Sequence, residues 1–568
     1  MSEQNTYVFE KRKTIKGYPE LHWTGKRPYE STQYFPAQLR ERYGEEQDGW
    51  INKIFWGDNL QVMSHLLKEY RGKVDLIYID PPFDSKADYK KKVEIKGLGK
   101  TETDSTSFEE KQYGDIWTND EYLQFMYERL ILLRELLSDT GTIYLHCDWH
   151  KVHYLRMIMD DVFGNQNFIN EIIWSYTSGG AGKRCFSKKH DNLLAYGKTK
   201  NYYFVEQKCK RYVDRSKGYD PRIEYFYDEE TGKEYRWNLM TDVWTDLGII
   251  SPNGFERTDY PTQKPEDLLK RVLNTSTKEG DLVFDCFMGS GTTQAVAMKL
   301  GRRFIGADIN LGAIQTTTKR LVGVAEELTA NSDNEGKYTS FEVYNVNNYD
   351  FFRNPLEARE LIISALEIQK FDSGSVYDGE LDGRMVKILP VNRIATKADL
   401  EEFKSHLPYK TFESRKAENP NQPVEYITLV CMGHEPDLKA SLEQELSQYK
   451  LDIQIVDILR DKSVLQLKRE AEAEIVIEGD QLIIKEFFPL NLMQKLSLQK
   501  EFVEDWKQLV ESVMVDWNYD GVVLEAREID IAPKNDFVKG VYTIPEDAGR
   551  IKVKITDLLS ESLEIEVG

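Results

Sequence analysis

The chain has 568 residues, of which 40% are hydrophobic and 30% are charged, and its formal net charge is −21. A chain of this length usually folds as two or three domains, and its apolar runs fall short of the ~20 residues that a membrane-spanning helix needs. The polar first residues exclude a secretory signal, so we expect a cytoplasmic protein with no membrane contact. The five cysteines are scattered without a C-x-x-C pair, which argues against a disulfide framework and a structural zinc site.

The negative charge is concentrated in one part of the chain. Residues 331–568 carry 28 Lys and Arg against 46 Asp and Glu, so residues 1–330 are close to neutral. Within the near-neutral part, residues 183–217 hold eleven basic side chains with aromatic residues between them. This segment is therefore a candidate for contact with nucleic acid.

Short aliphatic runs, each followed by a turn and a helical pattern, predict five strands at residues 54–58, 74–80, 141–146, 282–285 and 303–308. This alternation indicates an α/β fold with a parallel sheet covered by helices on both faces. The best-marked helix begins at Thr118, where Thr-Asn-Asp-Glu forms a capping box. Residues 86–115 lack periodicity, and we expect a long functional loop there.

The strand that ends at Ile79 runs into Asp80-Pro81-Pro82-Phe83. In an open α/β sheet, this places a carboxylate, a rigid turn and an aromatic ring at the carboxyl edge, where ligands bind. The two prolines lack N–H donors, so nearby carbonyl oxygens can accept hydrogen bonds from a ligand amino group. A plain proline turn after a strand is the alternative interpretation.

A second motif comes much later in the chain. The strand at residues 282–285 leads through Cys286-Phe287-Met288-Gly289-Ser290-Gly291 into a helix, a pattern typical of nucleotide-cofactor loops. It lacks the third glycine of a dinucleotide site and the Gly-Lys-Ser/Thr of an ATP site. The next strand ends at Asp308, where related nucleotide sites place an acid that binds ribose.

Together, the two motifs resemble those of the DNA amino-methyltransferases, in which D-P-P-F/Y is catalytic and F-x-G-S-G-T is the S-adenosylmethionine loop. The catalytic motif comes first, as in the circularly permuted group β, which includes modification subunits of type III restriction systems. The resemblance covers about residues 50–325. It implies a circularly permuted Rossmann-like fold and S-adenosylmethionine as cofactor. After about residue 330, helical segments mixed with alternating strands predict a separate α+β domain.

The resemblance also implies the site residues. Residues 57–60 are similar to the turn that meets the cofactor's adenine, and residues 262–265 are similar to the motif ahead of the cofactor loop. The expected catalytic residues are Asp80, Pro81, Pro82 and Phe83, and the expected cofactor-binding residues are Asp58, Thr262, Lys264, Asp285, Phe287, Gly289, Gly291, Thr292 and Asp308.

The chemistry follows from the target amine, which is a poor nucleophile because its lone pair is delocalised into the base. Hydrogen bonds to Asp80 and the Pro81 carbonyl would free that lone pair, and Phe83 would stack on the base. The base has to leave the duplex to reach this pocket. We expect the basic segment to hold double-stranded DNA through Lys183, Arg184, Lys188, Lys189, Lys208, Lys210 and Arg211.

The predicted organisation has five parts. They are an N-terminal arm (1–50), the catalytic half of the methyltransferase domain (51–174), a target-recognition insertion (175–258), the cofactor-binding half (259–330) and an acidic α+β domain (331–568) for partner docking or dimerisation.

The predicted function is site-specific N6-adenine methylation of DNA in a restriction-modification or phage-defence system. Asp80 favours adenine, because Ser often replaces it in cytosine-N4 enzymes. The open alternatives are N4-cytosine methylation, a sequence-recognition subunit for a restriction or helicase partner, and methylation of RNA or a protein glutamine. The cluster His146, Cys147, Asp148, His150 and His153 crosses a strand end into a helix, and we expect no metal there.

Overall fold

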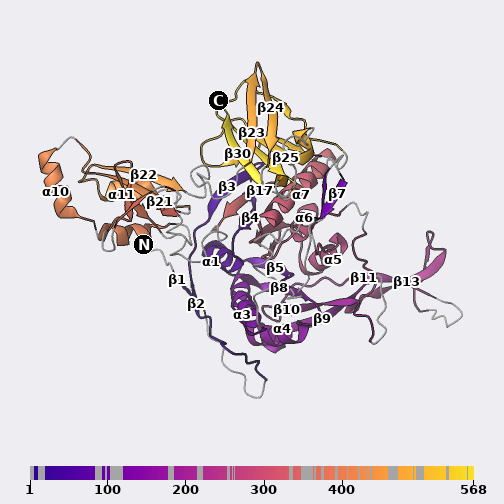
Figure 1. Ribbon diagram of the computed structural model, residues 1–568. Coiled ribbons are helices and arrows are strands. Elements are labelled where there is room, and N and C mark those ends of the chain that lie inside the picture. The colour runs from indigo at the N-terminus through magenta and orange to yellow at the C-terminus, as the bar shows by residue number, and fades with distance from the viewer. Residues whose placement is uncertain are drawn as a thin grey trace.

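The computed structural model describes residues 6–9, 19–82, 92–95, 99–102, 119–176, 185–213, 222–251, 256–258, 260, 262–331, 337–346 and, with shorter gaps, 362–567. Its largest feature is an 11-stranded mixed sheet (Figure 1). The strand order is β14 (Val243–Trp244), β9 (Phe168–Ser175), β10 (His190–Gly197), β8 (Leu137–Cys147), β5 (Val74–Ile79), β15 (Leu282–Asp285), β16 (Arg303–Asp308), β4 (Asn52–Trp56), β17 (Phe341–Asn345), β3 (Gln38–Tyr43) and β26 (Leu524–Glu525).

The centre of this sheet is parallel, from β8 through β5, β15, β16 and β4 to β17. Strand β10 then pairs antiparallel with β8 on one side and with β9 on the other. All five predicted strands are present as β4, β5, β8, β15 and β16. The sheet is therefore Rossmann-like, with an antiparallel strand on each side of the parallel set: β10 beside β8, and β3 (Gln38–Tyr43) beside β17.

Helices cover both faces of the sheet. One face packs against α1 (Asn59–Tyr70), α3 (Asn119–Leu136) and α4 (Val152–Met159), and the other against α5 (Glu266–Ser276), α6 (Thr292–Lys299) and α7 (Leu311–Ala330). Each face has its own apolar core, because side chains of successive strand residues point to opposite sides. The helix predicted from Thr118 is α3; Thr118 itself lies outside the described residues.

The segment expected as a loop at residues 86–115 contains a hairpin. Strand β6 (Lys92–Ile95) pairs antiparallel with β7 (Gly99–Glu102), so the lack of apolar periodicity did not mean a lack of strands. The two strands form a sheet of their own.

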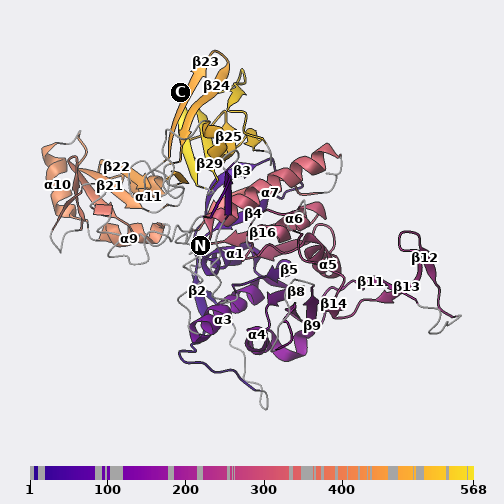
Figure 2. The same ribbon diagram turned by 45° about the vertical axis from the view of Figure 1, so that its right-hand side comes forward.

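A three-stranded sheet, here called the finger, projects from the main body (Figures 1 and 2). It consists of β11 (Lys208–Tyr212), β13 (Lys233–Leu239) and β12 (Phe226–Asp228), with β13 in the middle. Aromatic rings line one face, where Tyr235 stacks on Phe226 and meets the edges of Tyr212 and Trp237. Trp237 and Tyr212 are exposed, so this face is open to a ligand.

Residues after 346 form two further units (Figure 1). The first is a five-stranded sheet of β18 (Gln369–Lys370), β19 (Gly379–Leu381), β20 (Arg384–Ile388), β21 (Glu425–Cys431) and β22 (Leu451–Asp457), with helices α9 (Lys397–Ser405), α10 (Tyr409–Glu418) and α11 (Leu438–Glu445). The second has two sheets that share one core: β23 (Glu472–Glu478), β24 (Gln481–Phe488) and β28 (Val541–Thr543), and β27 (Glu528–Ile531), β25 (Val510–Asp516), β29 (Ile551–Asp557) and β30 (Ser562–Val567).

The predicted segment boundaries differ from the sheet in two places. The boundary after residue 330 falls before β17, which pairs with β4 and therefore belongs to the main sheet. The arm predicted at residues 1–50 contributes β3, which pairs with β17 and with β26 of the carboxyl-terminal unit. Both differences arise because strands that are far apart in the sequence pair with one another. Local composition does not reveal such pairing.

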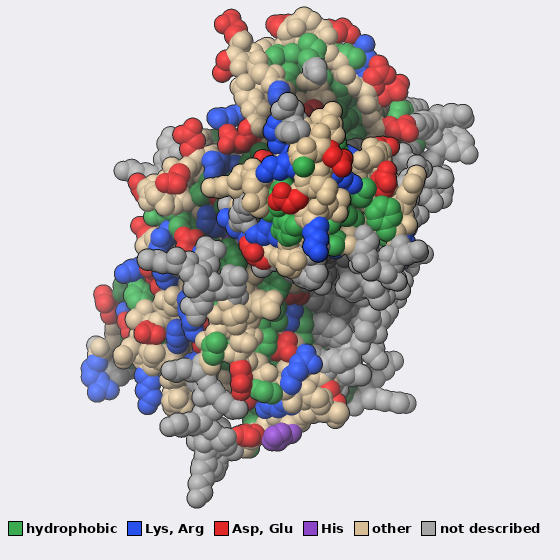
Figure 3. Space-filling model, turned by 90° about the vertical axis from the view of Figure 1, so that its left-hand side faces the viewer, with side chains coloured by type: hydrophobic (Ala, Val, Ile, Leu, Met, Phe, Trp, Pro, Cys, Tyr) green, Lys and Arg blue, Asp and Glu red, His purple; other side chains and the backbone are tan. Residues whose placement is uncertain are grey.

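The two shortest ion pairs between the described residues of the last unit and the main body involve Lys554 and Lys319. Lys554 on β29 contacts Glu41 on β3 at 2.6 Å, and Lys319 on α7 contacts Glu511 on β25 at 2.8 Å. On the face seen in Figure 3, acidic and basic side chains are interspersed over the described surface. Among the described residues, no helix is long and apolar enough to cross a membrane.

Candidate active site

The two sequence motifs meet at one edge of the main sheet. Strands β5 and β15 are parallel neighbours, with Leu76 opposite Val283 and Ile77 opposite Phe284. Asp80 follows β5 and the glycine loop follows β15, so both leave the carboxyl ends of adjacent strands. In an open α/β sheet, this is the edge at which ligands bind.

The Asp80 carboxylate is nearly buried and its two oxygens differ. Oδ2 accepts a hydrogen bond from Lys264 Nζ, and the two side chains are 17% and 12% exposed. Oδ1 is buried and has no hydrogen-bond partner among the described residues. Pro81 and Pro82 follow directly, whereas Phe83 lies outside the described residues.

Lys264, which is predicted to bind the cofactor, therefore lies against Asp80. It comes from the turn ahead of α5, at the residues that resemble the family motif. Thr262 in the same turn has a positive φ of 66°, a backbone conformation that is uncommon outside glycine. This turn places the Lys264 side chain at the end of β5.

A series of hydrogen bonds joins side chains of β5, β8 and β10 near this edge of the sheet. Tyr78 Oη shares a hydrogen bond with His146 Nδ1 at 2.7 Å, and His146 Nε2 lies 3.2 Å from Asp191 Oδ2. Tyr176 Oη donates to Asp191 Oδ1 at 3.2 Å. Burial alone would raise the pKa of Asp191, but the hydrogen bonds with His146 and Tyr176 and the charges of His146 and Lys264 outweigh it and lower the pKa.

Sequence reasoning did not find Asp191 or Tyr78. Asp191 lies on β10 and Tyr78 on β5, and only the pairing of β8 with both strands brings them to His146. Two other members of the cluster considered for metal contact each other, since His150 Nδ1 lies 2.7 Å from Asp148 Oδ2.

The glycine loop is shaped by two carboxylates. Asp285 accepts hydrogen bonds from Phe287 N at 3.0 Å and Thr293 Oγ1 at 2.7 Å. Asp308 accepts from Gly289 N and Asn310 N, both at 2.9 Å. Asp285 and Asp308, which are predicted to bind the cofactor, thus form hydrogen bonds that fix the glycine loop.

Glycine is required at two loop positions. Gly289 has φ 50° and Gly291 has φ 69°, and a Cβ at Gly291 would lie 2.5 Å from the Thr317 side chain. Thr292 follows at the start of α6, where it is buried and accepts a hydrogen bond from Arg320 at 2.8 Å. Any larger residue at Gly291 would displace the loop.

The loop carboxylates have raised pKa values. Burial raises the pKa of Asp285 to about 7 against the hydrogen bonds from Thr293 and Phe287 N, and the charges of Asp80 and Asp308 raise it further. Burial likewise raises the pKa of Asp308 to about 6, against three backbone hydrogen bonds. Three acidic groups therefore share one edge, which favours a positively charged ligand.

Asp58 lies in the turn between β4 and α1. It caps α1 by accepting from Leu60 N at 2.9 Å, and Arg129 on α3 contacts its other oxygen at 2.9 Å. The neighbouring Asn59 donates to the Cys286 carbonyl at 3.1 Å. The start of α1 is thereby tied to the start of the glycine loop.

The predicted DNA-binding residues do not form one patch. Lys188 lies over the Trp149 ring at 3.3 Å, near the first residues of β10, whereas Lys208, Lys210 and Arg211 are on the finger. Lys189 lies next to Lys188, and Lys183 and Arg184 are outside the described residues.

On the finger itself, the three basic residues have different surroundings. Lys210 contacts Asp228 at 2.8 Å and lies over the Tyr235 ring, so it holds the finger together. Lys208 shares the aromatic face of the strand with Lys210, and Arg211 points to the other face. Lys208 and Arg211 therefore cannot contact the same surface of a ligand.

Comparison with known proteins decides the family. A family model described as DNA methylase matches residues 74–319. The type II methyltransferase M.EcaI of Enterobacter cloacae is 30% identical over 47% of this chain and 69% of its own length. The chain belongs to this DNA methylase family. The matched region contains the Asp80 turn, the glycine loop and most of the main sheet, so the edge described above lies within the methylase part.

Two further relatives cover similar shares of the methylase. The type II methyltransferase M.HpaI of Haemophilus parainfluenzae is 31% identical over 44% of this chain and 68% of its own. The DNA adenine methyltransferase YhdJ of Escherichia coli K12 is 28% identical over 49% of this chain and 84% of its own. The match to the family model ends at residue 319, so the two carboxyl-terminal units of the methylase lie outside the matched region.

Proposed function

We propose that this methylase transfers a methyl group from S-adenosylmethionine to N6 of an adenine flipped out of double-stranded DNA. The observation that carries the proposal is Asp80 Oδ1, which is buried and has no partner among the described residues. A buried carboxylate oxygen is costly to leave unpaired, so it calls for a ligand donor. The amino group of a base has N–H donors of this kind.

The residues of the edge fit the methyl donor. The carboxylates of Asp80, Asp285 and Asp308 suit its positively charged sulfonium, and Gly289 and Gly291 supply the positive φ angles that shape the loop ahead of α6. When bound, S-adenosylmethionine supplies the activated methyl group. Aligning this group with the amine and excluding water are then the main tasks of the protein.

In this proposal, Asp80 Oδ1 accepts one N–H of the target amine and the Pro81 carbonyl accepts the other. These hydrogen bonds draw the nitrogen away from conjugation with the ring and expose its lone pair. Lys264 fixes the orientation of Asp80 by holding Oδ2. The proton released from the methylated amine can pass to the adjacent Asp80 carboxylate. Phe83 keeps its predicted role of stacking on the base.

Cytosine N4 is the second candidate target, because its exocyclic amine presents the same donors to Asp80. The relative YhdJ is named as an adenine methyltransferase, which supports adenine. Methylation-aware sequencing of DNA from cells that express the full chain separates the two bases and reports the recognition site. Modified cytosine without modified adenine would overturn the assignment to adenine.

Replacing Asp80 with Ala tests the active site. We expect the D80A protein to lose methylation and to retain specific DNA binding, because the substitution removes the acceptor but no DNA-facing charge. A matched control is D139A, since Asp139 is a highly exposed carboxylate at the other end of the β5–β8 pair. Methylation by D80A at the rate of D139A would refute the site.

The finer architecture is also part of the proposal. The Asp80 half precedes the glycine-loop half, which supports a circularly permuted methyltransferase domain. Residues 175–258, including the finger, serve as the target-recognition insertion, and the acidic residues 331–568 dock a restriction or helicase partner or a second copy. Light scattering of the full chain measures the oligomeric state, and a monomer would exclude the second copy.

A further inference from the structure

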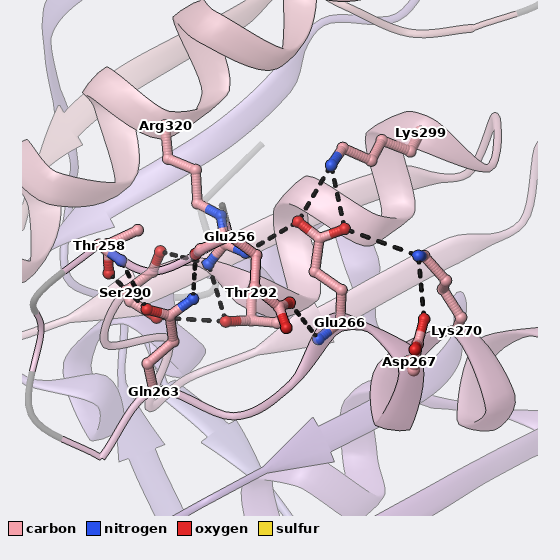
Figure 4. Close-up of polar contacts among 10 residues, drawn as sticks. All are labelled: Glu256, Thr258, Gln263, Glu266, Asp267, Lys270, Ser290, Thr292, Lys299 and Arg320. Atoms are coloured by element: carbon pink, nitrogen blue, oxygen red, sulfur yellow. Dashed lines mark hydrogen bonds and ion pairs between the residues drawn. The ribbon is translucent and has the colours of Figure 1, made fainter. Parts of the chain in front are cut away.

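Glu266, the first residue of α5, lies at the junction of three helices (Figure 4). Its side chain is 9% exposed, and its two oxygens each accept a hydrogen bond from Lys299 at the end of α6 at 3.0 Å. Arg320 of α7 donates to the same carboxylate at 2.9 Å. One acidic group therefore fastens α5, α6 and α7 together.

Arg320 continues from this junction to the glycine loop (Figure 4). Its side chain is 8% exposed, and its Nη1 donates to Thr292 Oγ1 at 2.8 Å and to the Ser290 carbonyl at 3.3 Å. Its Nη2 is the group that contacts Glu266. The guanidinium thus uses separate nitrogens for the helix junction and for the loop, which a lysine ammonium cannot do with the same geometry.

Glu266 also anchors the turn that carries Lys264. Its backbone N donates to the Glu256 carboxylate at 2.8 Å, and Gln263 donates to the Glu256 carbonyl at 2.6 Å (Figure 4). Gln263 Oε1 in turn accepts from both the N–H and the hydroxyl of Thr258. Since Lys264 lies between Gln263 and Glu266, both ends of its turn are held while its side chain reaches Asp80.

The electrostatics keep Glu266 charged. Burial opposes ionisation, but the contacts with Lys299 and Arg320 outweigh it and lower the pKa of Glu266. A buried ion pair often adds little net stability relative to apolar side chains. The geometric effect of the Glu266–Arg320 pair is large, because the pair joins the Lys264 turn to the glycine loop through short contacts.

We propose that Glu266 and Arg320 are positioning residues that hold the glycine loop in register with the Lys264 turn. In this arrangement, Arg320 sets the loop for S-adenosylmethionine, and Glu266 sets both the loop and the Lys264–Asp80 contact. The proposal rests on the proposed function, since it assigns the two ligand sites to these two segments. Neither side chain needs to touch a substrate.

Steady-state methylation by the full-length variants R320Q, R320K and E266Q tests the proposal. We expect R320Q to raise the KM for S-adenosylmethionine by about tenfold or more with a smaller change in kcat, because small displacements of a binding loop are costly. R320K should fall between R320Q and the parent protein. E266Q should raise KM and also lower kcat, because it loosens the Lys264 turn as well. The double variant E266Q/R320Q should lose less activity than the sum of the two single losses, since the residues act as one unit.

A matched control separates positioning from stability. Lys319 is adjacent to Arg320 on α7 and pairs with Glu511 instead, so K319Q removes one cation and one ion pair without touching the loop. We expect K319Q to lower Tm and leave KM unchanged. If R320Q and R320K lower Tm but keep the parent KM and kcat, the proposal is wrong.

The direct binding of S-adenosylmethionine, measured by calorimetry, tests the proposed function and the positioning role separately. A parent protein that binds no S-adenosylmethionine refutes the proposed function and the positioning role together. A parent protein that binds it and methylates DNA, with R320Q and E266Q binding it equally well, refutes the positioning role alone.

Discussion

Lys264 Nζ donates to Asp80 Oδ2, although 184 residues separate the two in the sequence. The contact compensates the charge of one carboxylate oxygen and leaves Oδ1 buried without a partner among the described residues. A lysine in this place therefore holds one oxygen of the carboxylate and leaves the other available as an acceptor.

Replacing Lys264 with Met removes the cation beside a nearly buried carboxylate and releases its orientation. We expect kcat to fall by about 100-fold, since a displacement of about 1 Å at a reacting group costs that much. DNA affinity, measured by fluorescence anisotropy, should be unchanged, because Lys264 faces Asp80. If K264M methylates at more than half the parent rate, Lys264 does not orient Asp80.

The affinity for S-adenosylmethionine should depend on pH. The pKa of Asp285 is raised to about 7 and that of Asp308 to about 6, so both carry protons in the free protein at mildly acidic pH. A bound sulfonium favours the ionised carboxylates and lowers both pKa values, so binding releases protons. Affinity should therefore rise between about pH 5 and about pH 8 and then level off.

Calorimetry in two buffers of different ionisation enthalpy measures this proton release. S-adenosylhomocysteine is the control, because its sulfur is neutral and its binding should release fewer protons. Equal proton release by the two ligands would show that the carboxylates do not sense the sulfonium.

The finger residues should affect DNA binding differently. We expect K208E and R211E each to reduce the slope of log K against log salt by about 1 if that side chain contacts a phosphate. Because the two residues lie on opposite faces of β11, only one of them should do so. Equal and large effects of both would mean that DNA surrounds the finger.

Lys210 should behave as a structural residue. K210E would place a carboxylate beside Asp228, which already accepts hydrogen bonds from Tyr212 Oη and from the backbone of Glu230 and Thr231. We expect K210E to make the finger sensitive to limited proteolysis, whereas K208E should not. Protection of K210E equal to that of the parent would contradict this role.

The contact between Lys554 and Glu41 should stabilise the docking of the last unit onto β3. Both side chains are nearly buried, at 6% and 14% exposed. Replacing Lys554 with Met leaves the Glu41 carboxylate with a hydrogen bond from Tyr43 Oη but without its cation, and removal of one partner of a buried ion pair typically costs about 3–5 kcal/mol. Urea unfolding should show that loss for K554M and a smaller one for E41Q/K554M, because the double variant leaves no unpaired charge. Equal losses would exclude charge pairing as the cause.

The central strands and both motifs could be predicted from the sequence, because their signals are local. The aliphatic run of β5 marks a buried strand by itself, and the turn at Asp80 follows from adjacent prolines. The glycine loop is likewise continuous in the chain, and the positive φ of Gly291 explains why a glycine stands there. Family membership was therefore within reach of the sequence alone.

The contacts that complete the site were decided by the tertiary structure. Lys264 reaches Asp80, and Arg320 joins Glu266 to Thr292, only because β5 and β15 pair and α5, α6 and α7 pack on one face of the sheet. The same holds for β17 and β26, whose place in the main sheet depends on partners far away in the chain. Residue type and spacing predict the local structure of a segment, whereas hydrogen bonds between distant segments depend on how the whole chain folds.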